Sequence, residues 1–546
     1  MTSNATCRTE GPEMAGTPDE VRTLGGLLEH QTAEYGDETF FRTRGEAYSY
    51  RDLDGRANAI ANELYANGVT AGDVVCLYMY NRPEYLYTLF ALAKIGAVAA
   101  PIDTRFTDET LAHVLTETDA DIVILDGDTE AAYETVRNEV ATISTELFVG
   151  GDPDGTYRDF DLLLEGEESS APDVDVRGTD PCSVIYVQRY QRPHPQGVVL
   201  PHYSYINTGT VSGGELLGLT QDDCLFTTLP FYSSYPIQMG VAGALSIGAE
   251  FAFEKQFESD RFWELIRQYD ATVFLYLGRM LSVLYNQAER PDDDDNPAAY
   301  AVGHGFGFGS DETMIANFER RFDVTVLEAY GITPTATLAT TNRPDDRRLG
   351  SVGKPLPHAD IKIVDEDDWE VPAGETGEIL VRSTELNAMF DRFYEDDDLT
   401  VEVCRDRWIH TNDVGYLDED GYLYFVASKR NTIHLGRVAG RISSLEIESV
   451  LESHPEVRES VVFGVATGTG EEAIKAVVVP VAGTSPSPIE LSEHCEKQLT
   501  YHKLPRFIEV RSELPRSASG KVRKDRVRDV SGASVWDRES GYDLNR

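Results

Sequence analysis

The chain has 546 residues, of which 94 are Asp or Glu and 48 are Lys or Arg, so its formal net charge is −46. A chain of this length exceeds one ordinary hydrophobic core, and we expect a large body with at least one smaller domain. The charge argues against nucleic acid or an anionic membrane as a partner, and no apolar run reaches the roughly eighteen residues of a membrane span.

Lysine is rare on this acidic chain, because only 10 of the 48 basic residues are Lys. An acid-rich, lysine-poor surface is typical of a halophilic protein, since salt screens the repulsion between like charges. We prefer a solvated surface to an acidic interaction tail. The six cysteines form no CxxC pair, which argues against a disulfide framework or a zinc site. The first residues lack a basic segment followed by an apolar one, so we expect a cytoplasmic protein.

The predicted elements begin with alternating helices and strands. From Thr23 to about Gly127, helical segments such as GRANAIANELYANG alternate with apolar runs such as DVVCLYMY and DIVILDG. The same rhythm returns from Cys182 to about Thr341, so we expect two α/β subdomains with parallel or mixed sheets. After Gly350, short strands separated by turns predict a small β-rich subdomain.

A separate unit is expected near the C-terminus. From about Ser428, a helix (SLEIESVLESH), two strands (ESVVFGV and AIKAVVVPV) and a final helix (PIELSEHCEKQL) predict a small α+β domain. We therefore expect a frayed N-terminus, a large domain, a small domain and a tail. Their predicted bounds are residues 1–22, 23–428, 429–530 and 531–546.

A series of motifs occurs in order along the chain. They are NRPEYLYTLFALAKIGAVAAPID, LPFYSSYPIQMG, FERRFDVTVLEAYGIT, LGSVGKPLP, GETGEILVR, RWIHTNDVGYLDEDGYLYFV, SSLEIESVLESHPEV and LPRSASGKVRK. Together they resemble the AMP-forming acyl-CoA synthetases of the adenylate-forming ligase superfamily, over about residues 23 to 530. Within that superfamily the chain looks nearest to carnitine/crotonobetaine-CoA ligases and fatty-acyl-CoA ligases.

The resemblance implies an ATP-dependent acid–CoA ligase. In such enzymes a carboxylate attacks the α-phosphate of MgATP to give acyl-AMP and pyrophosphate, and the CoA thiolate then displaces AMP. Both steps depend on positioning and charge stabilisation, and the small C-terminal domain is mobile between them. The implied substrates and cofactors are a fatty or carnitine-like acid, ATP, Mg²⁺ and coenzyme A, and a homodimer stays open.

Five residues take expected roles from the matching motifs. Lys521 in SASGKVRK corresponds to the lysine that contacts the substrate carboxylate and the α-phosphate, and Asp413 in HTND to the aspartate that binds the ribose hydroxyls. Tyr330 and Gly331 in EAYGIT match the adenine contacts, and Thr333 matches a residue near the phosphates. Taken alone, Lys521 would be a surface lysine, Asp413 a turn or cap residue and Tyr330 a core aromatic.

Other expected site residues also come from the resemblance. Arg430 matches the position of the hinge between the two domains. The acyl pocket is expected near residues 232–239 and 274–280, whose apolar and aromatic content admits aliphatic or aryl acids. Its candidate residues are Tyr232, Ser233, Tyr235 and Gly278.

The phosphate-binding loop of the family is replaced. That loop is rich in Ser, Thr and Gly, and its backbone amides wrap pyrophosphate. Here VQRYQRPHPQ stands at residues 187–196, between SVIY and the retained GVVLPH that starts at Gly197. If these ten residues are written in GC-rich codons and read one base later, they become SSGTSGPTR, a sequence rich in Ser, Thr and Gly. We therefore infer a compensated frameshift in the gene or its sequencing. The alternative is a functional cationic loop, in which Arg189, Arg192 and His194 meet phosphate.

Further positions depart from the family. The glutamate that helps to hold Mg²⁺ is Pro334, whose side chain offers no ligand atom, so no metal ligand is assigned. An arginine that contacts ribose and phosphate is Ser428. These departures leave open a second function, in which a catalytically impaired pseudoenzyme or decayed gene product keeps the ligase scaffold as a ligand-binding or partner-binding protein.

Overall fold

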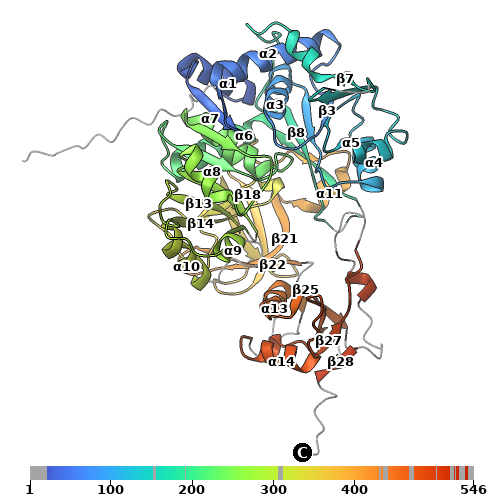
Figure 1. Ribbon diagram of the computed structural model, residues 1–546, viewed down its shortest axis with the longest axis vertical. Helices are drawn as coiled ribbons and strands as arrows, with labels where there is room; N and C mark the ends of the chain where they lie inside the picture. The colour runs from blue at the N-terminus through green and yellow to red at the C-terminus, as the bar shows by residue number, and fades with distance from the viewer. Residues whose placement is uncertain are drawn as a thin grey trace, which may run out of the picture.

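The structure is a computed structural model that describes residues 21–151, 155–190, 192, 194–278, 280–304, 312–429, 432–434, 441–466, 472–499, 501–516, 522, 524–527 and 535–538. Figure 1 shows a large body of sheets and helices and, at one end of the molecule, a small C-terminal unit. Among the described residues, the body contains three sheets, and the C-terminal unit contains a two-stranded and a four-stranded sheet. The predicted α/β architecture is therefore confirmed.

One lobe of the body is built on an eight-stranded sheet in the order β19-β9-β8-β4-β3-β5-β6-β7. Its central strands are parallel, whereas β8 and β9 form an antiparallel pair. The segment that replaces the family's phosphate-binding loop, residues 187–196, is called the altered segment below, and it connects β8 to β9. The strand bounds are Arg392–Phe393 for β19, Gln196–Pro201 for β9, Pro181–Val187 for β8, Val98–Pro101 for β4, Val74–Tyr78 for β3, Ile122–Asp126 for β5, Thr145–Val149 for β6 and Arg158–Asp159 for β7.

The second lobe is a nine-stranded sheet in the order β16-β15-β14-β13-β12-β10-β11-β1-β2, parallel from β14 to β1. The parallel strands end at one edge of the sheet, where polar residues can meet a ligand. The strand bounds are Lys354–Pro355 for β16, Thr340–Thr341 for β15, Thr325–Tyr330 for β14, Tyr300–His304 for β13, Val273–Leu277 for β12, Cys224–Thr227 for β10, Glu250–Phe253 for β11, Thr39–Thr43 for β1 and Glu46–Ser49 for β2.

The third sheet of the body is antiparallel and matches the predicted β-rich subdomain. It consists of β17 (Ala359–Val364), β18 (Gly377–Ser383), β21 (Trp408–Leu417) and β20 (Cys404–Arg405), with β22 (Leu423–Ser428) paired to β21. The C-terminal unit follows. Its strands are β23 (Thr432–His434), β24 (Arg441–Ser443), β25 (Val457–Ala466), β26 (Glu472–Pro480), β27 (Phe507–Val510) and β28 (Val535–Asp537).

Helices cover these sheets, and their ends follow local sequence signals. Helix α2 starts at a Ser49–Asp52 capping box, and helix α3 begins at Pro83 and ends at Gly96, whose φ is 70°. The α-helix bounds are Leu24–Tyr35 for α1, Tyr50–Ala66 for α2, Pro83–Ile95 for α3, Asp108–Glu117 for α4, Glu130–Val136 for α5, His202–Thr210 for α6, Ala242–Ile247 for α7, Phe262–Tyr269 for α8, Met280–Tyr285 for α9, Glu312–Phe322 for α10, Asp397–Val403 for α11, Ser444–Glu452 for α13 and Pro488–Glu496 for α14.

Helix α3 carries the longest apolar stretch of the sequence, and it is buried inside the body. Its one basic side chain, Lys94, is 2% exposed and pairs with Glu29 at 2.6 Å and Asp54 at 2.9 Å. A buried charge with two carboxylate partners is compensated, so this helix suits a protein core. In the described part of the chain, no helix has the length and apolar character of a membrane span.

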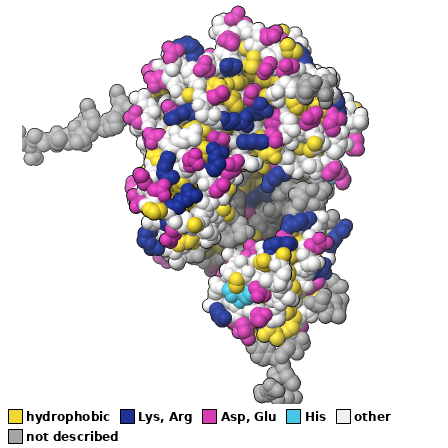
Figure 2. All heavy atoms as spheres, in the orientation of Figure 1, with side chains coloured by type: hydrophobic (Ala, Val, Ile, Leu, Met, Phe, Trp, Pro, Cys, Tyr) yellow, Lys and Arg dark blue, Asp and Glu magenta, His cyan; other side chains and the backbone are white. Residues whose placement is uncertain are grey.

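Acidic side chains are spread over the surface. Figure 2 shows Asp and Glu scattered across one face of the large body, with Lys and Arg among them, rather than gathered in one patch. This distribution fits a solvated acidic surface better than a local acidic tail.

Candidate active site

A cavity of about 200 Å³ lies at the carboxyl ends of β8, β12, β13 and β14. Five residues predicted from the sequence line it, namely Arg189, Ser233, Tyr235, Gly331 and Thr333. A larger cavity around Lys94 contains none of the predicted site residues. The smaller cavity is therefore the candidate active site.

The turn after β14 forms one wall of this cavity. A Cβ atom at Gly331 would lie 1.8 Å from the carbonyl oxygen of Thr337, so only glycine fits there. Thr333 begins a short 3₁₀ helix, Thr333–Thr335, that lines the cavity. The close approach that requires glycine is thus an approach to the protein's own backbone.

Asp413 is buried beside this cavity and is 1% exposed. Its Oδ2 accepts a hydrogen bond from the Tyr330 hydroxyl at 2.9 Å and forms an ion pair with Arg189 Nη2. Arg189 also donates from Nε to the carbonyl oxygen of Thr411 at 2.9 Å. The arginine that was expected to meet phosphate therefore pairs with the aspartate that was expected to hold ribose.

Charge and burial keep this group in defined protonation states. Burial opposes the charged guanidinium of Arg189, but the Asp413 carboxylate raises its pKa above the usual value, so Arg189 stays charged. Burial and the Asp413 charge raise the pKa of Tyr330 well above its usual value. Tyr330 therefore stays protonated and serves as a hydrogen-bond donor.

A bulge in β21 sets the direction of Asp413. Residues 411–413 of β21 together face one residue of β18, Ile379. Asn412 has a φ of 55°, a left-handed conformation that Asn tolerates better than most residues. Since a bulge re-aims the side chains next to it, the HTND sequence turns Asp413 toward Tyr330 and Arg189.

Neutral polar groups surround the rest of the cavity. Burial, with a smaller contribution from Arg189, lowers the pKa of His304 to about 4, so its imidazole is neutral near pH 7. The ring of Tyr235 lies 5.6 Å from that of His304, and its hydroxyl donates to the carbonyl oxygen of Val302 at 2.8 Å. With Arg189 paired to Asp413, these groups add no net charge to the cavity.

Besides Tyr330 and Asp413, four predicted residues among those described lie outside the lining of this cavity. Arg192 pairs with Glu402 at 2.8 Å, away from the cavity. Gly197 lies in β9, where a Cβ would be 2.7 Å from Val184, so this glycine serves sheet packing. The ring of Tyr232 lies 5.7 Å from the guanidinium of Arg105, and the backbone N–H of Gly278 donates to the carbonyl oxygen of His304 at 2.9 Å.

Two further predictions fall outside the described residues, those for Lys521 and Arg430. At the expected magnesium position, the carbonyl oxygen of Pro334 accepts a hydrogen bond from the backbone N–H of Phe390 at 3.0 Å. Neither its ring nor this engaged carbonyl suits a hard cation that prefers carboxylate oxygens. The residues at this position therefore do not fit Mg²⁺.

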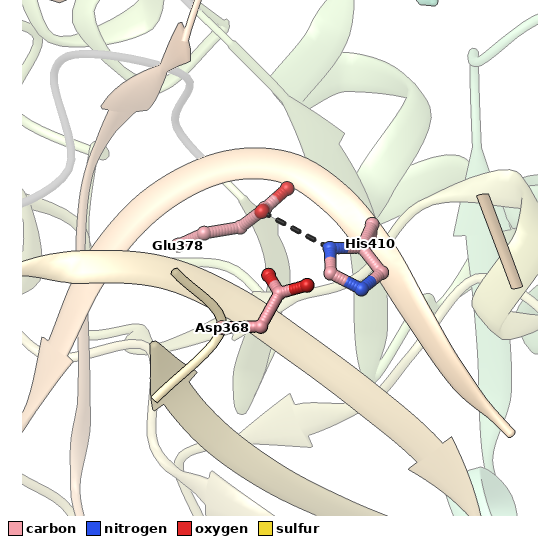
Figure 3. A group of neighbouring side chains, drawn as sticks. All are labelled: Asp368, Glu378 and His410. Carbon is pink, nitrogen blue, oxygen red and sulfur yellow. Dashed lines mark hydrogen bonds and ion pairs between the residues drawn. The ribbon is translucent and has the colours of Figure 1, made fainter. Parts of the chain in front are cut away.

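Asp368, Glu378 and His410 form a cluster that the sequence analysis did not predict (Figure 3). One ligand atom from each lies within 4.8 Å of the others, as a metal site would require. However, Arg405 donates to Asp368 at 2.9 Å, and Lys429 donates to Glu378 at 2.8 Å. Because protein cations already hold both carboxylates, we treat the cluster as an ion-pair network.

The chain matches two family models. The model described as "AMP-binding enzyme" matches residues 28–187 and 193–390, and the model described as "AMP-binding enzyme C-terminal domain" matches residues 446–521. The first match is interrupted at residues 188–192, inside the altered segment.

Relatives and solved structures resemble the chain over most of its length. Crotonobetaine/carnitine–CoA ligases of Salmonella heidelberg (strain SL476) and Salmonella typhimurium (strain LT2) are each 30% identical over 504 residues, covering 90% of this chain and 96% of the relative. An anthranilate CoA ligase in complex with anthranoyl-AMP has a TM-score of 0.81 at 22% identity, covering 93% of this chain and 96% of the other. A benzoate CoA ligase from Burkholderia xenovorans LB400 has a TM-score of 0.78 at 21% identity, covering 93% and 100%. The two structures support the fold.

Proposed function

The chain belongs to the AMP-binding enzyme family, and from this premise we propose that it is an ATP-dependent acid–CoA ligase. The observation that carries the proposal is the cavity in which the predicted adenine-side, phosphate-side and acyl-side residues meet beside Asp413. The relatives are named as ligases, and no observation on the described residues favours the alternative of an inactive scaffold.

The reaction has two balanced steps. A carboxylate oxygen of the acid attacks the α-phosphorus of ATP, the bond to the β-phosphate breaks, and pyrophosphate leaves. The thiolate of coenzyme A then attacks the acyl carbonyl, and the bond to AMP breaks. Asp413 would hold the ribose hydroxyls, Gly331 would border the adenine, and Thr333 would donate to a phosphate oxygen.

The class of acid is proposed from the relatives, which are named crotonobetaine/carnitine–CoA ligases and are 30% identical to this chain. Fatty acids and carnitine-like acids therefore head the list of substrates to test. Lys521 is proposed to contact the substrate carboxylate in the first step. The proposed domains are residues 23–428 and 429–530, and Arg430 is proposed to act as the hinge about which the C-terminal domain moves.

Several finer features accompany this proposal. Mg²⁺ would arrive bound to the phosphates of ATP, and no step is assigned to a protein-held ion because Pro334 does not fit it. The net charge of −46 supports work in a cytoplasm of high salt. A homodimer and a role in fatty-acid metabolism stay predictions.

Exchange of labelled pyrophosphate into ATP tests the proposal, because it reports the first step without coenzyme A. The full-length protein is assayed at high KCl concentration with a panel of fatty, carnitine-like and aryl acids. We expect exchange that depends on one class of acid. A folded protein that gives no exchange with any acid would contradict the ligase function.

A further inference from the structure

Glu378 is enclosed at the centre of the ion-pair network and has no part in the proposed chemistry. Its side chain is 5% exposed. Its Oε2 accepts from Lys429 Nζ at 2.8 Å and lies 3.1 Å from Nδ1 of His410 (Figure 3). Its Oε1 accepts from the backbone N–H of Asn412 at 3.0 Å. One carboxylate therefore holds β21 and the residue that follows β22.

These two contacts lie on either side of Asp413. In the pairing of β21 with β22, Asp413 is opposite Ser428. Asn412 directly precedes Asp413, and Lys429 directly follows Ser428. Glu378 is thus bound to a neighbour of each member of this pair.

The bulge explains why a carboxylate is needed here. Residues 411–413 face one residue of β18, so the backbone N–H of Asn412 does not find its acceptor in a regular ladder. A buried N–H without an acceptor is costly, and Glu378 supplies the acceptor. Burial opposes the charge of Glu378, yet its hydrogen-bond contacts with His410 and Lys429 hold its pKa below the usual value.

We propose that Glu378 is a positioning residue, which fixes the bulge so that the Asp413 carboxylate meets the ribose hydroxyls of the nucleotide. Lys429 lies where the C-terminal unit begins, and its ammonium group pairs with the carboxylate of Glu378. The inference rests on the proposed function in one respect, namely that Asp413 holds the ribose.

Binding of AMP, measured by equilibrium dialysis on the full-length protein, tests this role without requiring catalysis. Glu378→Met keeps the length of the side chain and removes both acceptor oxygens, whereas Glu378→Gln keeps one. Each change is made in the natural chain and in Arg189→Ser, so that Arg189 does not mask Asp413. The matched control is Asp360→Asn, which removes an exposed ion pair with Arg382 from the same sheet.

We expect Glu378→Met to weaken AMP binding about tenfold, as the loss of hydrogen bonds to ribose implies. Binding of 2′,3′-dideoxy-AMP, which lacks the hydroxyls, should stay nearly unchanged, and Glu378→Gln should lie between. A folded Glu378→Met protein that binds AMP as its parent does overturns the inference. Equal losses for AMP and the dideoxy analogue also overturn it, because they indicate a general structural role.

The outcomes also separate this inference from the proposed function. If neither parent protein binds AMP, the ribose role of Asp413 is wrong, and the role of Glu378 fails with it. If AMP binding follows the expected pattern but no acid supports pyrophosphate exchange, the ligase function is contradicted and the positioning role stands.

Discussion

Replacing Arg189 by serine is expected to strengthen nucleotide binding. In the structure its guanidinium pairs with Asp413 and hydrogen-bonds the carbonyl oxygen of Thr411. A ribose that uses Asp413 must first displace this guanidinium. Serine is too short to reach Asp413 from that backbone position, so Arg189→Ser leaves the carboxylate available to the ligand.

The size of the effect follows from the burial of the pair. The side chains of Arg189 and Asp413 are 20% and 2% exposed, so solvent screens their interaction only weakly. A hydrogen bond to a charged group contributes about 1.5–3 kcal/mol net. Removing the competing interaction should therefore raise AMP affinity roughly ten- to a hundredfold. The same change leaves Asp413 with fewer donors, so we expect the free energy of unfolding to fall by about 1–3 kcal/mol.

Calorimetric titration with AMP, together with denaturant unfolding, measures both quantities. Arg192→Ser is the matched control, because Arg192 lies in the same segment and pairs with the exposed Glu402. A surface pair of that kind contributes about 0–1 kcal/mol, so the control should change neither quantity strongly. Unchanged AMP binding in Arg189→Ser would refute the competition, and weaker binding would indicate instead that Arg189 itself contacts the nucleotide.

Three other changes probe the surroundings of the site. Burial raises the pKa of Glu328 to about 8 against the opposing effect of Arg347. Since the pKa of Glu328 is higher in the folded than in the unfolded protein, the free energy of unfolding should fall as pH rises from about 4.5 to 8. Glu328→Gln should make the free energy of unfolding less dependent on pH over that range. Gly331→Ala would force a Cβ against the Thr337 carbonyl oxygen, so it should cost about 1–3 kcal/mol and abolish AMP binding, whereas Gly127→Ala, with space around it, should do neither. Because the net charge is −46, the unfolding midpoint should rise with KCl concentration, and a midpoint independent of salt would contradict the halophilic interpretation.

The sequence predicted the architecture and part of the site for a physical reason. The motif EAYGIT lies at the carboxyl end of β14, and residues at the ends of neighbouring parallel strands come together without further information, whereas HTND lies at the bulge inside the antiparallel strand β21. Gly331 and Thr333 were predicted from the resemblance of EAYGIT to the family's motif, and both line the cavity. Tyr330 and Asp413 are also adjacent, joined by a hydrogen bond of 2.9 Å.

Contacts between side chains that are far apart in the sequence were not predictable from it. Glu378 lies in the quoted motif GETGEILVR, but its partners Asn412 and Lys429 become neighbours only through a bulge and a strand pairing that no local pattern encodes. The partner of Arg189 was missed for a related reason. A cation at a position of the phosphate-binding loop suggests that it binds phosphate, whereas in the folded chain Arg189 pairs with the buried carboxylate of Asp413.

Replacing the altered segment distinguishes the cationic-loop hypothesis from the frameshift hypothesis. In the structure Arg189 and Arg192 are both paired with carboxylates, so a phosphate could engage either cation only by breaking an ion pair. This weakens the hypothesis of a functional cationic loop. The frameshift hypothesis predicts that replacing residues 187–196 by SSGTSGPTR supplies glycine amides for phosphate and removes the cation opposite Asp413.

The replaced protein should bind AMP at least as well as Arg189→Ser and should bind ATP better than it, because only the glycine-rich segment can enclose the additional phosphates. Calorimetric titrations with AMP and ATP measure both. Equal affinities of the two proteins for ATP would show that the glycine amides contribute nothing, and the segment as written would then be the native loop. A genomic read that encodes SSGTSGPTR would lead to the opposite conclusion without any binding measurement.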